Sequence, residues 1–210
     1  MFRLVFLLVV GAGFAWSAEP SAFDRWIARQ AEIRTLSADF TQSRALRVLR
    51  NPVAARGHLW YQAPGNFRWQ VGDPPKIIVL RKGADVRVIE PAKKTVKIEA
   101  LEVGRREAGL MEFPFARSRA ELEKRFAVAD VKEEGSVCRV KLLPRDTQGF
   151  LAGVQLAFNT ENLHLLMLEM SFRDGSSVRS EFSNIEVDGK LPAGIFAPDT
   201  TGYQVIDASR

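Results

Sequence analysis

The stretch GHLWYQAPGNFRWQV, residues 57–71, decides the fold class. Apolar and polar residues alternate on both sides of the turn-forming Pro64-Gly65-Asn66, and this pattern predicts a β-hairpin. The alternation gives each strand one apolar face, formed by Leu59 and Tyr61 before the turn and by Phe67, Trp69 and Val71 after it. Two of the chain's four tryptophans lie here. The hairpin is therefore either ordinary core or the wall of an apolar cavity.

Short strand patterns recur along the chain at a spacing of about ten residues, as in barrels and sandwiches. Outside the hairpin we expect strands at 36–42, 76–81, 86–89, 95–99, 136–143, 153–159, 163–173, 177–182 and 185–187. Capping patterns at Ser21 and Ser118 predict a helix over 21–34 and a shorter one after Ser118, and we expect residues 104–114 to be irregular or partly helical. The chain is therefore predicted to be mainly β with some α: an incomplete, half-open antiparallel β-barrel with helices covering a concave apolar cavity.

The N-terminus has the pattern of a secretory signal peptide. Arg3 is followed by an apolar run without charge over 4–14 and then by small residues. This run is shorter than the roughly 20 residues that span a bilayer. We expect cleavage after Ser17 or Ala18, and favour Ser17 because it places Ala15 three residues before the cut. The predicted organisation is a signal peptide over 1–17 and one domain over 18–210; the alternative is an uncleaved N-terminal anchor.

The charge and the cysteine content limit the classes of binding partner and the cellular compartments that fit this chain. The net charge is +5, which suits a basic surface or weak attraction to anionic lipid head groups, and no nucleic-acid motif accompanies it. The single cysteine, Cys138, excludes an intramolecular disulfide and lies too far along the chain to carry an N-terminal lipid anchor. We therefore expect an exported, soluble periplasmic protein, acting as a monomer without nucleic acid.

The sequence offers no pattern typical of catalysis. His58 and His164 have no Cys, His or carboxylate near them at metal-ligand spacing. Neither a Gly-x-Ser-x-Gly elbow nor a phosphate-binding glycine loop is present, and Cys138 lies in a strand pattern typical of a buried thiol. We therefore predict a protein that is not an enzyme and uses no metal or cofactor.

Four segments together resemble the LolA-like family of periplasmic lipoprotein carriers. They are LSADFTQ (36–42), GHLWYQAPGNFRW (57–69), FPFARSRAELEKRFAV (113–128) and the stretch from MSFRDG to YQVID (170–207). The resemblance implies a soluble carrier that binds lipoprotein acyl chains and shuttles them from the inner to the outer membrane. It also implies three kinds of partner: lipid-modified proteins, an inner-membrane ABC-type releasing complex and an outer-membrane acceptor. The alternative is a periplasmic carrier or sensor of another lipid or glycolipid on the same fold.

We predict seven apolar side chains as the cavity wall: Phe40, Leu59, Phe67, Trp69, Ile78, Leu122 and Met170. Of these, Phe67 matches a residue beside the cavity mouth in the family. One position departs from the family pattern. Its well-studied carriers have an arginine before the hairpin proline, thought to latch the lid, where this chain has Ala63. Arg56, Arg68 or another basic residue is then the expected substitute.

Overall fold

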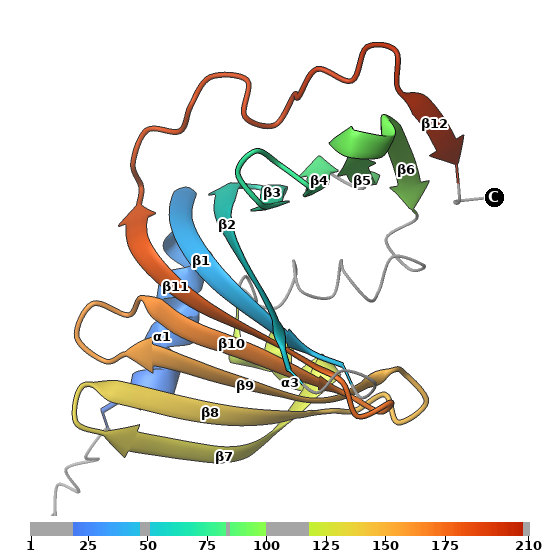
Figure 1. Ribbon diagram of the computed structural model, residues 1–210. Helices are drawn as coiled ribbons and strands as arrows, with labels where there is room; N and C mark the ends of the chain where they lie inside the picture. Colours follow the sequence, from blue (N-terminus) through green and yellow to red (C-terminus); the bar gives the residue numbers. More distant parts are fainter. Residues whose placement is uncertain (1–18, 47–50, 83–84, 100–117, 208–210) are drawn as a thin grey trace, which may run out of the picture.

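The computed structural model describes residues 19–46, 51–82, 85–99 and 118–207. Within these ranges twelve strands form one sheet in the order β12-β6-β5-β4-β3-β2-β1-β11-β10-β9-β8-β7. Neighbouring strands are antiparallel except β12 and β6, which run parallel. The sheet curves strongly but does not close (Figure 1). The predicted half-open, mainly antiparallel barrel is confirmed.

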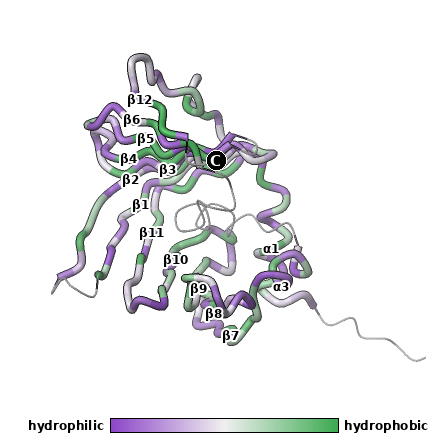
Figure 2. Tube along the Cα trace, turned by 90° about the vertical axis from the view of Figure 1, so that its right-hand side faces the viewer, coloured by the Kyte–Doolittle hydropathy of each residue, from purple (hydrophilic) through white to green (hydrophobic). Residues whose placement is uncertain are grey.

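The first half of the sheet and the N-terminal helix are α1 (Ala22–Glu32), β1 (Thr35–Ala45), β2 (Val53–Gln62), β3 (Asn66–Val71), β4 (Ile77–Lys82), β5 (Asp85–Glu90), the 3-10 turn η1 (Pro91–Lys93) and β6 (Thr95–Glu99). The second half is α3 (Arg119–Arg125), β7 (Phe126–Glu134), β8 (Val137–Pro144), β9 (Leu151–Asn159), β10 (Leu165–Phe172), β11 (Ser177–Val187) and β12 (Gln204–Asp207). Seen from the side, the strands follow an arc, with α1 and α3 beside the β7–β10 end (Figure 2).

Both helices begin where the capping patterns predict. The Ser21 side chain accepts a hydrogen bond from the Asp24 backbone N–H, and Ser118 does the same for Glu121. Such a cap satisfies one of the backbone donors that the first turn of a helix leaves unpaired. Arg119 of α3 then pairs with Asp24 of α1 at 2.8 Å, which ties the two helices together.

Two apolar clusters fill the concave side of the sheet. The larger joins α1 and α3 to β8–β11 and includes Trp26, which stacks on Phe158 with ring centroids 5.2 Å apart. The second covers β1–β5 and includes Ile33, directly after α1. Phe182 of β11 packs against both clusters. The concave side is therefore one continuous apolar surface, partly covered by helices.

The convex side of β3–β6 is covered by the C-terminal strap, which we define as residues 191–203. Under it, Tyr203 packs on a third apolar cluster of Ile78, Ile89 and Val96. The Arg68 guanidinium donates to the strap carbonyl of Ile195 at 2.9 Å and lies over the Trp60 ring. The strap thus shields an outer face that would otherwise expose apolar side chains.

Two of the described strands were not predicted from the sequence, and a third was predicted as two separate strands. β7 carries a charged run, Asp130 to Glu134, on a sheet edge, where alternation is lost because most of its side chains are exposed. β12 has only four residues. The expected strands 177–182 and 185–187 are one strand, β11, with an irregularity in its pairing with β1 around Asn184, whose φ is +49°. The expectations for residues 1–17 and 104–114 lie outside the described residues.

Candidate functional site

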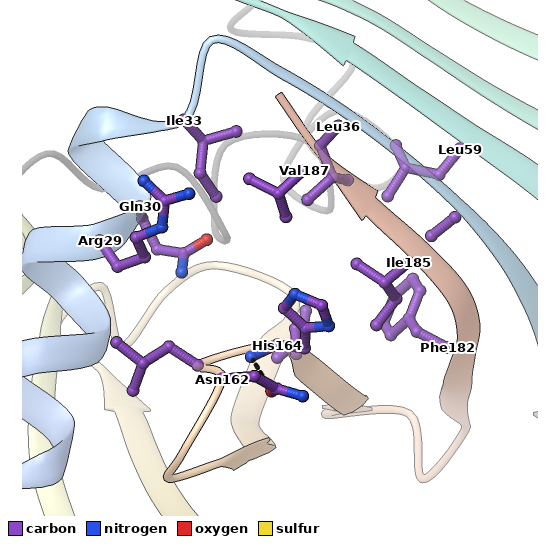
Figure 3. A pocket seen from close by; sticks show the side chains of 13 residues that line it. Arg29, Gln30, Ile33, Leu36, Leu59, Asn162, His164, Phe182, Ile185 and Val187 are labelled. Carbon is purple, nitrogen blue, oxygen red and sulfur yellow. Dashed lines mark hydrogen bonds between the residues drawn. The ribbon is translucent and has the colours of Figure 1, made fainter. Parts of the chain in front are cut away.

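A pocket on the concave side lies between the end of α1 and the sheet, where the two concave clusters meet (Figure 3). Its cavity volume is small, about 30 Å³, and the hollow around it opens to solvent. Thirteen residues line it: Arg29, Gln30, Ile33, Leu36, Ala38, Leu59, Asn162, Leu163, His164, Leu165, Phe182, Ile185 and Val187. Nine of these are apolar, so the pocket suits a hydrocarbon ligand.

Strand alternation builds most of the apolar wall. Leu36 and Ala38 face the pocket from β1, and Leu59 faces it from β2, directly opposite Ala38 in the strand pairing. Ile185 and Val187 contribute from β11, on the other side of β1. Because side chains two apart in a strand share a face, these residues form a continuous surface across three neighbouring strands.

The four polar lining residues come from two places on one side of the pocket. Arg29 and Gln30 belong to the last turn of α1, while Asn162 and His164 belong to the loop between β9 and β10. The Asn162 side chain accepts a hydrogen bond from the His164 backbone N–H at 2.9 Å, which fixes the loop (Figure 3). The pocket is therefore amphipathic, with an apolar wall and a polar margin.

Arg29 also connects the helix to the sheet. Its guanidinium pairs with Asp188, directly after β11, at 3.1 Å. The other Asp188 oxygen accepts from the Arg34 backbone N–H at 2.8 Å, and these bonds, with help from Arg29, hold the pKa of Asp188 below its ordinary value. This arrangement fixes the end of α1 against the sheet beside the pocket.

The structure brings some of the predicted cavity residues to the pocket and leaves others apart from it. Leu59 lines the pocket directly. Phe40, Phe67 and Trp69 lie buried in the adjoining cluster on the same concave side. Leu122 and Met170 are buried in the helix-covered cluster.

Ile78 does not join the other predicted residues. It packs with Ile89 and Val96 under the C-terminal strap, on the opposite face of the sheet. Its neighbour Val79 faces the concave side instead. The apolar run IIVL in β4 has no alternation, because this strand is covered on both faces, and the run therefore offers no basis for choosing the inward residue.

Sequence reasoning missed most of the pocket lining. Arg29, Ile33, Leu163 and His164 lie at a helix end or in a loop, where periodicity carries no information. In β10 the pairing with β9 shifts between Leu165 and Met167, so simple alternation along the strand does not identify Leu165, which packs on the core. In β11 Phe182 lies in the regular alternating part of the strand, so its inward direction was predictable. The irregularity that follows breaks the alternation, so the inward directions of Ile185 and Val187 were not predictable.

Neither of the named substitutes for the absent latch arginine faces the pocket. Ala63 is exposed at the hairpin turn. Arg56 is exposed and lies in β2 between inward-facing positions, so it points outward. Arg68 is buried under the strap on the convex side. Of the Arg and Lys residues in the described ranges, Arg29 is the one that lines this pocket.

The titratable groups of the described ranges offer binding groups rather than a reactive centre. No three His, Cys, Asp or Glu side chains within residues 19–46, 51–82, 85–99 and 118–207 gather in an arrangement that could hold a metal ion. Cys138 is buried, and burial, with help from the charge of Glu133, raises the pKa of its thiol to about 11. None of the helices in this part of the chain is long and apolar enough to cross a bilayer.

The fold is an open half-barrel whose concave face is apolar and partly covered by helices. With a pocket between α1 and the sheet, it has the architecture of a protein that holds an apolar ligand on its concave face. The chain belongs to the family described as outer membrane lipoprotein carrier protein LolA, which matches residues 31–199. This match spans most of the chain and includes the pocket residues from Ile33 to Val187.

Relatives in sequence agree with this assignment, and a solved structure shares the fold. An outer-membrane lipoprotein carrier protein of Methylococcus capsulatus is 29% identical over 203 residues, covering 91% of this chain and 94% of the relative. One of Bordetella avium is 26% identical over 196 residues, covering 92% and 90%. An uncharacterized conserved protein of Thermus thermophilus shares the fold, with a TM-score of 0.54 at 10% identity, covering 86% of this chain and 94% of that one.

Proposed function

We propose that this protein is a soluble periplasmic carrier that binds the acyl chains of lipoproteins and moves them from the inner membrane to the outer membrane. The observation that carries this proposal is the apolar pocket on the concave side, in a chain that belongs to the lipoprotein carrier family. The relatives that match over most of the chain are named as outer-membrane lipoprotein carrier proteins, which supports the same role.

The energetics of lipid transfer explain why such a pocket is useful. Burial of each acyl methylene is worth about 0.8 kcal/mol, so a chain of a dozen methylenes resists transfer to water by roughly 10 kcal/mol. A pocket lined by Leu59, Phe182 and Val187 replaces contact with water by apolar contact. Transfer then requires a shielded route rather than a covalent reaction, so the proposed function needs neither catalysis nor a cofactor.

The proposed pocket must also release its cargo. Its apolar walls come from two structural elements. Ile33 contributes from the end of α1, and Leu59 contributes from the curved sheet on the other side. A small separation of helix and sheet would enlarge the pocket, and closure would let the apolar walls meet each other again. Cargo binding would then shift the balance between a closed and an open form.

We further propose the route and the partners. The signal peptide over 1–17 directs export, and the mature domain over 18–210 works in the periplasm as a monomer. It receives lipid-modified proteins from an inner-membrane ABC-type releasing complex and delivers them to an outer-membrane acceptor. These steps rest on the family assignment.

Depletion of the protein in its native host tests this proposal. Outer-membrane lipoproteins should then accumulate in the inner membrane, as measured by fractionation and immunoblotting. If they still reach the outer membrane at the normal rate, the carrier proposal is wrong. Mass spectrometry of gently purified protein tests the alternative cargo: bound phospholipid or glycolipid without lipopeptide would favour a carrier or sensor of another lipid.

A further inference from the structure

The His164 side chain is unusual among the polar residues of the pocket. Its backbone is fixed on both sides, because its N–H donates to Asn162 and its carbonyl accepts from the Asn159 N–H at 3.0 Å. The imidazole ring is directed into the space between α1 and β11 (Figure 3). Among the described residues, the ring has no hydrogen-bond partner. A polar side chain on a fixed backbone that faces an apolar pocket without a protein partner is available to bind a ligand.

The second polar group is the Arg29 guanidinium, also beside the pocket. Two of its nitrogens meet carboxylates, Nη1 with Glu32 at 3.4 Å and Nη2 with Asp188 at 3.1 Å. Since a guanidinium has five N–H donors, these two bonds leave donor capacity for a ligand. The two carboxylates also balance the positive charge, so this margin of the pocket has no large excess charge.

The charge state of His164 follows from the same surroundings. Partial burial, and secondarily the nearby positive charge of Arg29, lowers the pKa of the ring below its ordinary value. No Asp or Glu is among the pocket residues. The imidazole is therefore neutral at neutral pH, with one nitrogen as a donor and the other as an acceptor.

We propose that Arg29 and His164 bind the ester or amide carbonyl oxygens at which the acyl chains of the cargo join its head group. The carbonyl oxygens lie at the polar margin of the pocket, and the chain beyond them lies against the wall formed by Leu59 and Phe182. This inference rests on the proposed carrier function and adds to it the part of the cargo that is recognised.

The charge balance favours a neutral carbonyl over an anionic group. A free carboxylate or phosphate would have to compete with Glu32 and Asp188 for Arg29. A carbonyl oxygen needs only a donor, and both side chains can supply one without breaking the ion pairs. Donors in a poorly hydrated pocket also discriminate strongly, because a ligand without the acceptor leaves them unpaired.

A binding comparison between two synthetic lipopeptides tests the inference. One carries ester-linked acyl chains on a glyceryl-cysteine, and the other carries the same chains through ether links that lack the carbonyls. Wild-type protein should bind the ester form more tightly. In Arg29→Met and His164→Phe the affinity for the ester form should fall about tenfold, the worth of one hydrogen bond of roughly 1.4 kcal/mol. Affinity for the ether form should stay within about twofold.

Matched substitutions separate this effect from general damage. Arg25→Met changes another α1 arginine, whose side chain donates to the Pro20 carbonyl, and His58→Phe changes a histidine on the convex side. Both should bind the ester form like wild type. His164→Gln, which keeps a donor, should restore most of the affinity that His164→Phe loses. Thermal unfolding of each variant verifies that it is folded.

The possible outcomes distinguish the inference from the function on which it rests. If wild-type protein binds neither lipopeptide, the carrier function itself is contradicted. If it binds both, and Arg29→Met and His164→Phe lower the two affinities equally or not at all, carbonyl recognition is wrong while lipid binding stands. Loss of affinity for the ester form alone supports the inference.

Discussion

Phe40 of β1 and Trp69 of β3 stack with ring centroids 3.9 Å apart, although β2 lies between their strands. The contact is possible because the β2 residue opposite Phe40 is Gly57. A Cβ atom at Gly57 would clash with the Phe40 ring and with the Gln70 carbonyl. The aromatic wall beside the pocket thus depends on a position in the hairpin that has no side chain.

Gly57→Ala should therefore destabilise the protein by about 1–3 kcal/mol, the usual cost of overpacking a filled core. Urea unfolding monitored by tryptophan fluorescence measures this change, and the weakened Phe40–Trp69 stacking should alter the native spectrum. The matched control is Gly153→Ala in β9, where a Cβ atom would meet only ordinary contacts of 3.7 and 4.0 Å. Equal stability of the two variants would contradict the packing argument.

The strap offers a second test, at Arg68. Arg68→Met keeps a long side chain over Trp60 but removes the hydrogen bonds to Ile195 and to the Gln70 side chain. We expect a loss of about 1 kcal/mol and faster proteolysis within residues 191–203, because the strap loses its attachment. Mass spectrometry of the fragments measures the rate of cleavage within the strap. The exposed Arg56→Met serves as the control, and an unchanged cleavage rate in Arg68→Met would exclude the proposed attachment.

Asp188 should contribute a pH-dependent part of the stability. Its folded-state pKa lies below the ordinary 3.8, chiefly through the bond from the Arg34 backbone. The stabilisation is therefore fully present above about pH 4 and is lost as the pH falls through the folded-state pKa. Because the side chain is 39% exposed, the effect should be under about 1 kcal/mol.

Asp188→Asn should therefore lower the unfolding free energy at pH 7 more than at pH 3, as measured by urea unfolding across this range. Thr35 and Arg34 can still donate to the asparagine oxygen, so the fold should be retained. A loss of equal size at both pH values would show that the Asp188 charge has no part in the stability.

Cys138 should be almost unreactive in the folded protein. Burial raises the pKa of this thiol to about 11, which at pH 8 lowers its thiolate fraction about a hundredfold relative to an ordinary thiol. Ellman's reagent should therefore label it only in denaturant. Rapid labelling of the native protein would mean that the core around β8 is open.

The sequence predicted most of the sheet because alternation is strong where one face is buried. The paired positions of the hairpin, Leu59 opposite Trp69 and Tyr61 opposite Phe67, follow directly from its pattern. The alternation failed in β4, which is covered on both faces, and in β7, which is mostly exposed. In both strands the tertiary surroundings, rather than the local sequence, decide which side chains are buried.

The pocket was harder to predict than the sheet. Its lining joins residues more than one hundred positions apart, such as Leu59 and His164, and a single sequence contains no signal for such contacts. Ile78 illustrates the limit, since its apolar character was evident but its side of the sheet was not. At the latch position the sequence showed only that Ala63 carries no charge. The ion pair between Arg29 and Asp188 beside the pocket became evident only in the folded structure.

Site-specific photocrosslinking in living cells tests the central claim most directly. The neighbouring positions Ile185 and Glu186 lie in β11, and Ile185 lines the pocket while Glu186 is exposed outside it. A photoreactive residue at 185 should crosslink to lipoproteins through their acyl chains, and the same residue at 186 should not. Crosslinking to lipoproteins from 186 but not from 185, or from neither position, would contradict the account of the concave pocket as the cargo site.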